Sequence, residues 1–84
     1  MIAGLIECTM LILSVINDMY KQQKITFDEF LSYTNLKIPF LSENIECISS
    51  EEDRIKANLI LSECTSIIFD YIQSNMKTDT AYSN

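Results

Sequence analysis

Acidic side chains form the densest group of residues that could carry chemistry in this 84-residue sequence. Five carboxylates fall between positions 43 and 53: Glu43, Glu46, Glu51, Glu52 and Asp53. Paired carboxylates act as general acid and general base where a cleft shifts their pKa values, and no pattern here indicates a cleft. Two interpretations remain open: a solvated connector whose last acids face the positive end of a helix dipole, or a docking surface for a basic partner.

Other residue types that enzymes use are missing from the sequence or isolated in it. The sequence has no His, which is the commonest general base at neutral pH and the commonest transition-metal ligand. It has one Gly, which is too few for a glycine-rich phosphate-binding loop. We therefore predict a protein that is not an enzyme, with no catalytic residues, no cofactor and no metal ion.

The three cysteines indicate the redox compartment. Cys8, Cys47 and Cys64 are an odd number without a C-x-x-C spacing, and two of them lie inside apolar helical segments. This pattern favours reduced thiols in the core over a disulfide framework. Reduced thiols are typical of the cytosol, so we predict a cytoplasmic protein.

The twelve residues from Asp18 to Glu29 resemble an EF-hand calcium loop, with Asp18, Thr26 and Glu29 at positions one, nine and twelve. The motif calls for Asp or Asn at positions three and five and for Gly at position six. The sequence departs from the motif at all three: Tyr20, Gln22 and Gln23. We therefore expect no calcium binding, and a helix-capping box explains the pairing of Thr26 with Glu29.

Charge and hydropathy limit the classes of partner. Twelve acidic against six basic residues give a net charge of −6, which repels nucleic acid phosphate and anionic lipid. We expect no nucleic acid partner. The apolar segment Ile2–Tyr20 raises the possibility of a membrane anchor, but it contains Glu7 and lacks the basic start and the cleavage site of a signal peptide. We therefore do not expect membrane binding.

Apolar spacing and capping signals predict an all-α fold of three helices, in which a helical hairpin is followed by a long C-terminal helix. The first helix covers Ile2–Tyr20. The second begins at Phe27 after the capping box and stops or kinks at about Lys37, because Pro39 disfavours continuation. A connector over 42–50 reaches Ser50, which caps the third helix. We expect one domain over residues 1–77 and a disordered tail over 78–84.

The last helix presents a core-facing stripe of eight residues: Ala57, Ile60, Leu61, Cys64, Ile67, Ile68, Tyr71 and Ile72. Three apolar residues, Ile55, Leu59 and Phe69, point away from that stripe. Single exposed apolar residues are normal in a small protein. This pattern alone therefore leaves two interpretations: ordinary exposed side chains, or a surface that binds a partner. The candidate partner-binding set combines two of these residues with the acids of the first turn: Ile55, Leu59, Glu51, Glu52 and Asp53.

The first helix has apolar side chains over half its circumference, more than one neighbouring helix can cover. We therefore expect it to lie in the middle of an assembly, which predicts a homo-oligomer, most simply a two-fold dimer. The resulting hypothesis is a small acidic protein that acts by binding another protein, as a regulator, inhibitor or adaptor. Two alternatives stay open: a structural homo-oligomer with no separate partner, and a membrane-surface protein held by its first helix.

Overall fold

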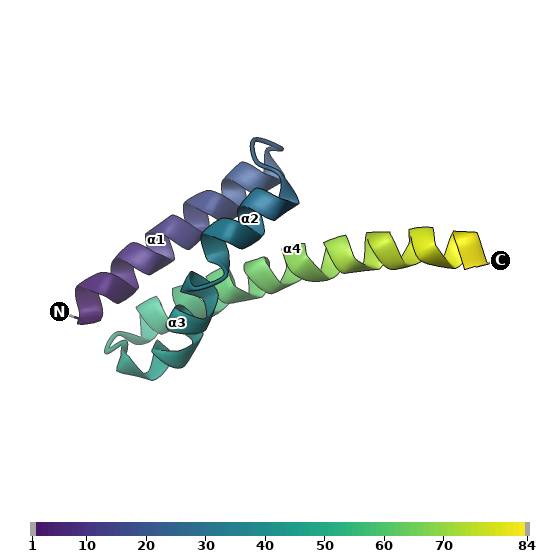
Figure 1. The fold of residues 1–84 in the computed structure, drawn as a ribbon. Coiled ribbons are helices and arrows are strands. Elements are labelled where there is room, and N and C mark those ends of the chain that lie inside the picture. The colour runs from purple at the N-terminus through teal and green to yellow at the C-terminus, as the bar shows by residue number, and fades with distance from the viewer. Residues whose placement is uncertain (1, 84) are drawn as a thin grey trace.

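The computed structural model describes the backbone of residues 2–83 and the side chains of residues 2–76. The elements in chain order are α1 (Ile2–Lys21), α2 (Phe27–Thr34), α3 (Lys37–Glu43), the short 3-10 helix η1 (Ile45–Cys47) and α4 (Glu51–Ser83). Residues 2–83 contain no strand, which confirms the all-α class. Figure 1 shows α1 and α2 side by side, while α4 runs past α3 and extends well past the other helices.

The turn after α1 is closed by a left-handed residue. The N–H of Gln23 donates to the Tyr20 carbonyl and the N–H of Lys24 donates to the Met19 carbonyl, each at 2.9 Å. This pair of bonds is the Schellman arrangement that ends many helices. It places Gln23 at a φ of 61°, where Gly is the usual residue. The bonds satisfy two of the last carbonyls of α1 and turn the chain towards α2.

The predicted capping box of α2 is confirmed. The Glu29 N–H donates to Thr26 Oγ1 at 3.1 Å, and the Thr26 N–H donates to Glu29 Oε1 at 2.9 Å. The predicted start of the last helix is also confirmed, because the Asp53 N–H donates to Ser50 Oγ at 3.3 Å and α4 begins at Glu51. Both helix starts depend on hydrogen bonds between a side chain and the backbone three residues away, so the residue types and their spacing in the sequence predict them.

The second helix was expected to stop or kink at about Lys37, and the structure ends α2 at Thr34 and begins a separate helix at Lys37. Asn35 and Leu36 separate α2 from α3, and α3 begins at Lys37 with Pro39 as its third residue. The first four N–H groups of a helix have no intrahelical acceptor, so Pro39 loses no hydrogen bond at this place. Residues 2–83 therefore form four α-helices where three were expected.

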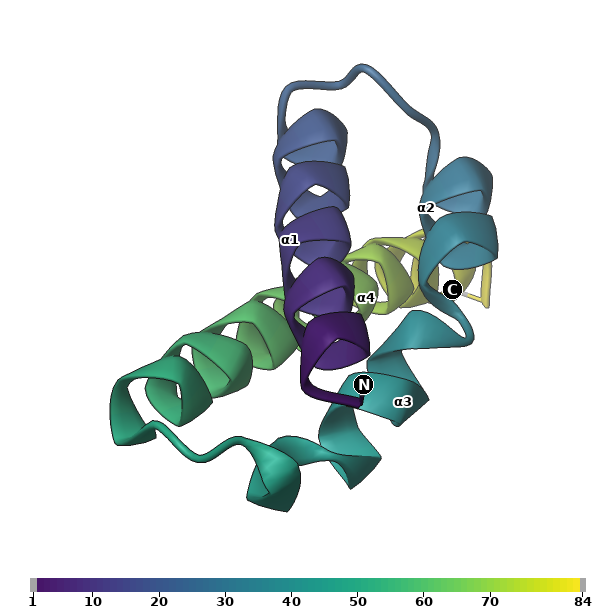
Figure 2. The same cartoon turned by 90° about the vertical axis from the view of Figure 1, so that its left-hand side faces the viewer.

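The core lies where α1 meets α2, α3 and α4. Figure 2 shows α1 in front of α4, with α2 and α3 on one side of it. Each of the four α-helices contributes at least one buried apolar residue, and Ile48 is added from the connector: Ile6, Leu13, Ile16, Phe30, Leu41, Ile48, Ala57, Cys64 and Ile67. One side of α1 thus packs against three helices of its own chain, while the other side remains uncovered.

Three expectations about burial are wrong. Cys8 was expected in the core and is exposed, whereas Cys64 is buried as expected. Tyr71 and Ile72 continue the apolar stripe of α4 but are 37% and 47% exposed, because only α2, through Phe27 and Leu31, lies beside that part of α4. The helix itself continues to Ser83. The tail expected over 78–84 lies outside the residues whose side chains the structure describes.

Candidate protein-binding surface

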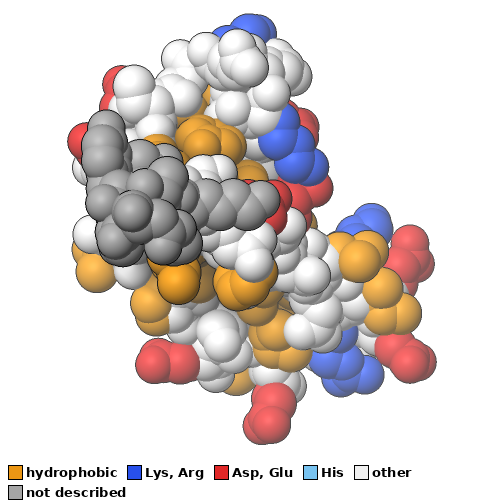
Figure 3. Space-filling model, turned by 90° about the vertical axis from the view of Figure 1, so that its right-hand side faces the viewer, with side chains coloured by type: hydrophobic (Ala, Val, Ile, Leu, Met, Phe, Trp, Pro, Cys, Tyr) orange, Lys and Arg blue, Asp and Glu red, His pale blue; other side chains and the backbone are white. Residues whose placement is uncertain are grey.

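The outward side of α4 carries the predicted apolar pair. Ile55 and Leu59 lie one helical turn apart and are 55% and 64% exposed, whereas Ala57 between them is completely buried. Residues two positions apart lie on nearly opposite sides of a helix, so one side of α4 faces solvent and the other faces the core. In Figure 3 hydrophobic side chains reach the surface at several places on the side shown, with acidic and basic side chains around them.

The structure separates the three acids of the predicted site. Glu51 and Glu52 are exposed in the first turn of α4, and helical geometry places them on either side of Ile55. Glu52 Oε1 lies 3.9 Å from Lys56 Nζ, an exposed pair one turn apart. Asp53 is half-buried and lies on the other side of the helix, beside α1. Two of the three acids thus border the apolar pair, and the third does not.

A groove between α1 and α4 begins at Leu59. Its volume is about 510 Å³ and it is lined by Glu7, Met10, Leu11 and Ser14 of α1 and by Asp53, Lys56, Leu59 and Ile60 of α4. Four of these side chains are apolar, and the charged ones stand among them. The groove joins the outward pair of α4 to the exposed Leu11 of α1. Sequence reasoning missed this connection, because the crossing of two helices cannot be seen in the spacing within either helix.

Leu59 also borders a second groove, which runs between α4 and the turn from α1 to α2. Tyr20, Ile25 and Phe27 line it from the turn side, and Ile67 and Tyr71 line it from α4. The Phe27 and Tyr71 rings stack in parallel with their centroids 3.7 Å apart. An ion pair between Lys21 and Glu63 joins α1 to α4 at the edge of this groove. Both partners are substantially exposed, so the pair contributes little to stability.

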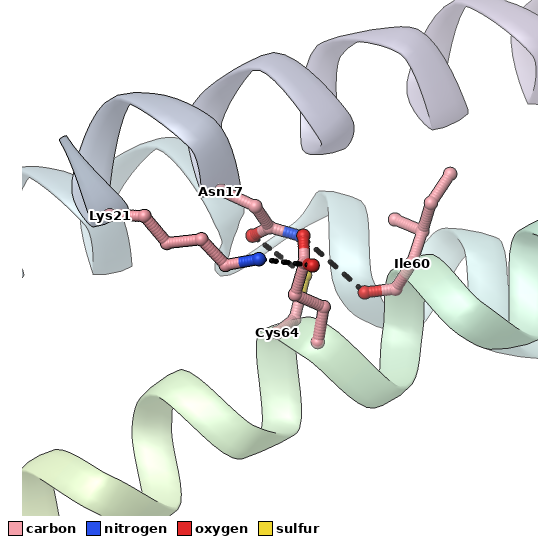
Figure 4. Close-up of polar contacts among 5 residues, drawn as sticks. Asn17, Lys21, Ile60 and Cys64 are labelled. Carbon is pink, nitrogen blue, oxygen red and sulfur yellow. Dashed lines mark hydrogen bonds and ion pairs between the residues drawn. The ribbon is translucent and has the colours of Figure 1, made fainter.

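A buried polar contact fixes how α1 crosses α4 (Figure 4). Asn17 is completely buried, its Oδ1 accepts a hydrogen bond from Cys64 Sγ at 3.3 Å, and its Nδ2 donates to the Ile60 carbonyl at 3.5 Å. Sliding α1 by one turn would leave the amide without these partners, which carries a large penalty in an apolar interior. Asn17 was not singled out in the sequence. Its place between Leu13 and Tyr20 on the core-facing side of the first helix is the signal that could have found it.

The Cys64 thiol is unsuited to nucleophilic chemistry. Burial raises its pKa above the ordinary value of 9.0, the charge of Glu63 raises it further, and the hydrogen bond with Asn17 opposes the rise. The thiol is therefore protonated at neutral pH, whereas a reactive cysteine needs the thiolate. Within residues 2–76 no three His, Cys, Asp or Glu side chains gather closely enough to hold a metal ion. Glu29, which would be the main ligand of a calcium loop, is held by its capping bond.

Among residues 2–83, α1 is the helix that is long and apolar enough to cross a membrane. It has 20 residues, a mean hydropathy of 1.6, and 28% of its most apolar window buried within the protein. Core helices of soluble proteins and signal sequences share this length and composition, so the observation alone decides nothing. It does identify the exposed side of α1 as an apolar surface that needs an explanation.

The comparisons with known proteins give no family. No protein-family model, no curated protein and no solved structure matches this chain. The surfaces described above must therefore carry any functional inference.

Proposed function

We propose that this protein acts by binding another protein, as a regulator, inhibitor or adaptor, in the cytoplasm and as a homodimer. The observation that supports the binding role is the exposure of Ile55 and Leu59, one turn apart on α4 and each more than half exposed. Apolar side chains in such positions do not stabilise the isolated chain to any large extent, since the core lies on the opposite side of the helix. A protein partner would bury them.

The acids around this pair suggest the chemistry of the partner. Glu51 and Glu52 flank Ile55, and the whole chain carries a net charge of −6. An apolar centre with a charged rim is the usual organisation of a small binding surface, in which the centre supplies affinity and the rim supplies orientation and association rate. The proposed partner surface is therefore apolar at its centre and basic at its edge.

The test is a comparison of two variants in partner capture. Replacing Ile55 and Leu59 together with Ala should change the free energy of unfolding by less than about 1 kcal/mol, because both side chains are exposed. Replacing Leu36, an 80% exposed residue between α2 and α3, with Ala is the matched control. Proteins that the wild type and the control capture from the native host, and that the double variant loses, would support the site.

Two results would contradict this proposal. A double variant that folds normally and captures the same proteins as the control would remove α4 as the binding surface. A loss of about 2–5 kcal/mol per residue in the free energy of unfolding would show that Ile55 and Leu59 are buried within the protein or its dimer.

The acids are tested separately. Replacing Glu51 and Glu52 with Gln should slow association with a captured partner and weaken the salt dependence of the association rate.

The apolar side of α1 favours one alternative, a protein whose unpaired apolar surface serves self-association alone. In that case no separate partner exists, and the homo-oligomer itself is the functional form. Hydropathy favours a second alternative, in which α1 rests on a membrane surface. The variants of α4 separate both alternatives from the main proposal, because neither alternative needs Ile55 or Leu59.

A further inference from the structure

The uncovered side of α1 carries a regular apolar stripe. Its members recur at alternating steps of three and four residues: Leu5, Cys8, Ile12, Val15 and Met19. This is the spacing of the a and d positions in a coiled coil, the seam along which two helices pack. The helix already uses its opposite side in the core of its own chain, so the stripe is a second apolar side of the same helix.

The stripe is open to solvent in the isolated chain. Leu5, Ile12 and Val15 are 60%, 41% and 48% exposed, Cys8 is exposed, and Met19 is half-buried. A methyl group added to Gly4, beside the stripe, would meet no heavy atom within 4 Å. The backbone of α1 is therefore accessible to a helix packed along this side.

The charges of α1 lie outside the stripe. Glu7 lines the groove shared with α4, Lys21 pairs with Glu63 of α4, and Asp18 stands at the margin. The stripe thus has no charged rim that would select a basic partner, in contrast to the outward pair of α4. It is also free of the like charges that would repel a second copy of this acidic chain.

The available apolar area lies at the lower end of what a dimer requires. A fully exposed aliphatic side chain loses roughly 60–120 Å² of apolar area on burial, so a half-exposed one loses about half of that. The stripe together with the neighbouring Leu11 therefore offers on the order of 200–350 Å² on each copy. A standard interface buries about 800 Å² per partner, a little over half of it apolar.

We propose that a second copy of this chain packs its own α1 along this stripe and forms a two-fold dimer. The inference rests on the self-association proposed above and assigns its surface. A heptad seam is self-complementary, since each side chain on one helix fits between those of an identical helix. A two-fold axis closes the contact, so assembly stops at two copies.

The first test is sedimentation equilibrium of the wild type, of Ile12→Asp and Val15→Asp, and of Leu36→Asp as the matched control. We expect the wild type to be a dimer. Both stripe variants should have a dimer dissociation constant at least about 100-fold higher, because a carboxylate in an apolar seam is strongly disfavoured. The control should have the same dissociation constant as the wild type. Circular dichroism checks that each variant is folded. Leu36 is 80% exposed and lies away from α1 in the sequence, so it reports any general effect of an added charge.

The outcomes separate the surface from the self-association itself. A monomeric wild type overturns both. A wild type and stripe variants that dimerise equally well overturn the α1 surface and leave the self-association standing. A monomeric wild type that sediments with phosphatidylcholine vesicles, while Ile12→Asp does not, assigns the stripe to a membrane and also overturns the proposal.

The second test uses the cysteines of the wild type and needs no substitution. Cys8 lies on the stripe and Cys47 lies away from it, and both are exposed in the isolated chain. Alkylation followed by mass spectrometry should show Cys8 reacting at least about tenfold more slowly than Cys47 when the protein is dimeric, and dilution should remove the difference. Buried Cys64 is the internal reference for an unreactive thiol. Equal reactivity of Cys8 and Cys47 in the dimer would overturn the proposal.

Discussion

The two halves of α4 have the same apolar period and different surroundings. Ala57 and Cys64 in the first half are completely buried, whereas Tyr71 and Ile72 in the second half are exposed. At 1.5 Å per residue α4 is about 50 Å long and α1 about 30 Å, so the body ends before α4 does. The period of a sequence thus shows which side of a helix is apolar, while the lengths of the other helices determine how far that side is covered.

One pair of equivalent substitutions tests this comparison with the largest expected effect. Ile67 is 7% exposed in the first half and Ile72 is 47% exposed in the second. Replacing Ile67 with Ala should lower the free energy of unfolding by about 2–5 kcal/mol, and the same change at Ile72 by less than about 1 kcal/mol. Urea denaturation at one low protein concentration measures both. Equal losses would mean that the second half of α4 is also packed.

Alkaline pH probes the buried thiol of the first half. The pKa of Cys64 is raised above 9.0 by burial, so the folded protein keeps a proton that the unfolded chain releases. The protonated thiol makes its full contribution to the free energy of unfolding below pH 9. As the pH rises from there through the pKa of the folded state, this contribution is lost, and the free energy of unfolding falls by at most about 1.4 kcal/mol per pH unit. Chemical denaturation as a function of pH measures this loss. The variant Cys64→Ala should lack this part of the decline, and an identical decline in that variant would contradict the assignment.

The stack of Phe27 on Tyr71 is the aromatic contact at the boundary between the two halves. A double-mutant cycle with Phe27→Leu and Tyr71→Leu should give a coupling of about 0.5–1.5 kcal/mol, the range for ring pairs beyond their buried area. Leu retains apolar volume, so the cycle isolates the ring contact. A coupling near zero would show that α4 is independent of the α1–α2 turn from Tyr71 onwards.

The sequence predicted those features that depend on neighbours in the chain. The capping box at Thr26, the start at Ser50 and the length of the first helix are all set by interactions within about four residues. The break at Asn35 and Leu36 was expected at about Lys37, and the separate helix α3 after it was not predicted, because Pro39 is compatible with the end of one helix or the first turn of the next. Which of these two roles Pro39 takes depends on the packing of Leu41 in the core, and that packing involves residues far away in the sequence.

The candidate surface was predictable only in part. The exposure of Ile55 and Leu59 was expected from their angle on the helix, and the structure agrees. The position of Asp53 beside α1 and the two grooves that meet at Leu59 depend on the crossing of α1 and α4. That crossing is fixed by the buried Asn17, whose partners come from residues more than forty positions away.

The distance in sequence between Asn17 and Cys64 also orders events during synthesis. The two residues are 47 positions apart, so α1 is synthesised before the part of α4 that carries Cys64. At roughly 5–20 residues per second, α1 waits about 2–10 seconds before the helix that covers its core side has been made. Of the helices that pack on α1, only α2 and α3 are complete at that time, so the part of the α1 surface that α4 covers has no partner until α4 follows.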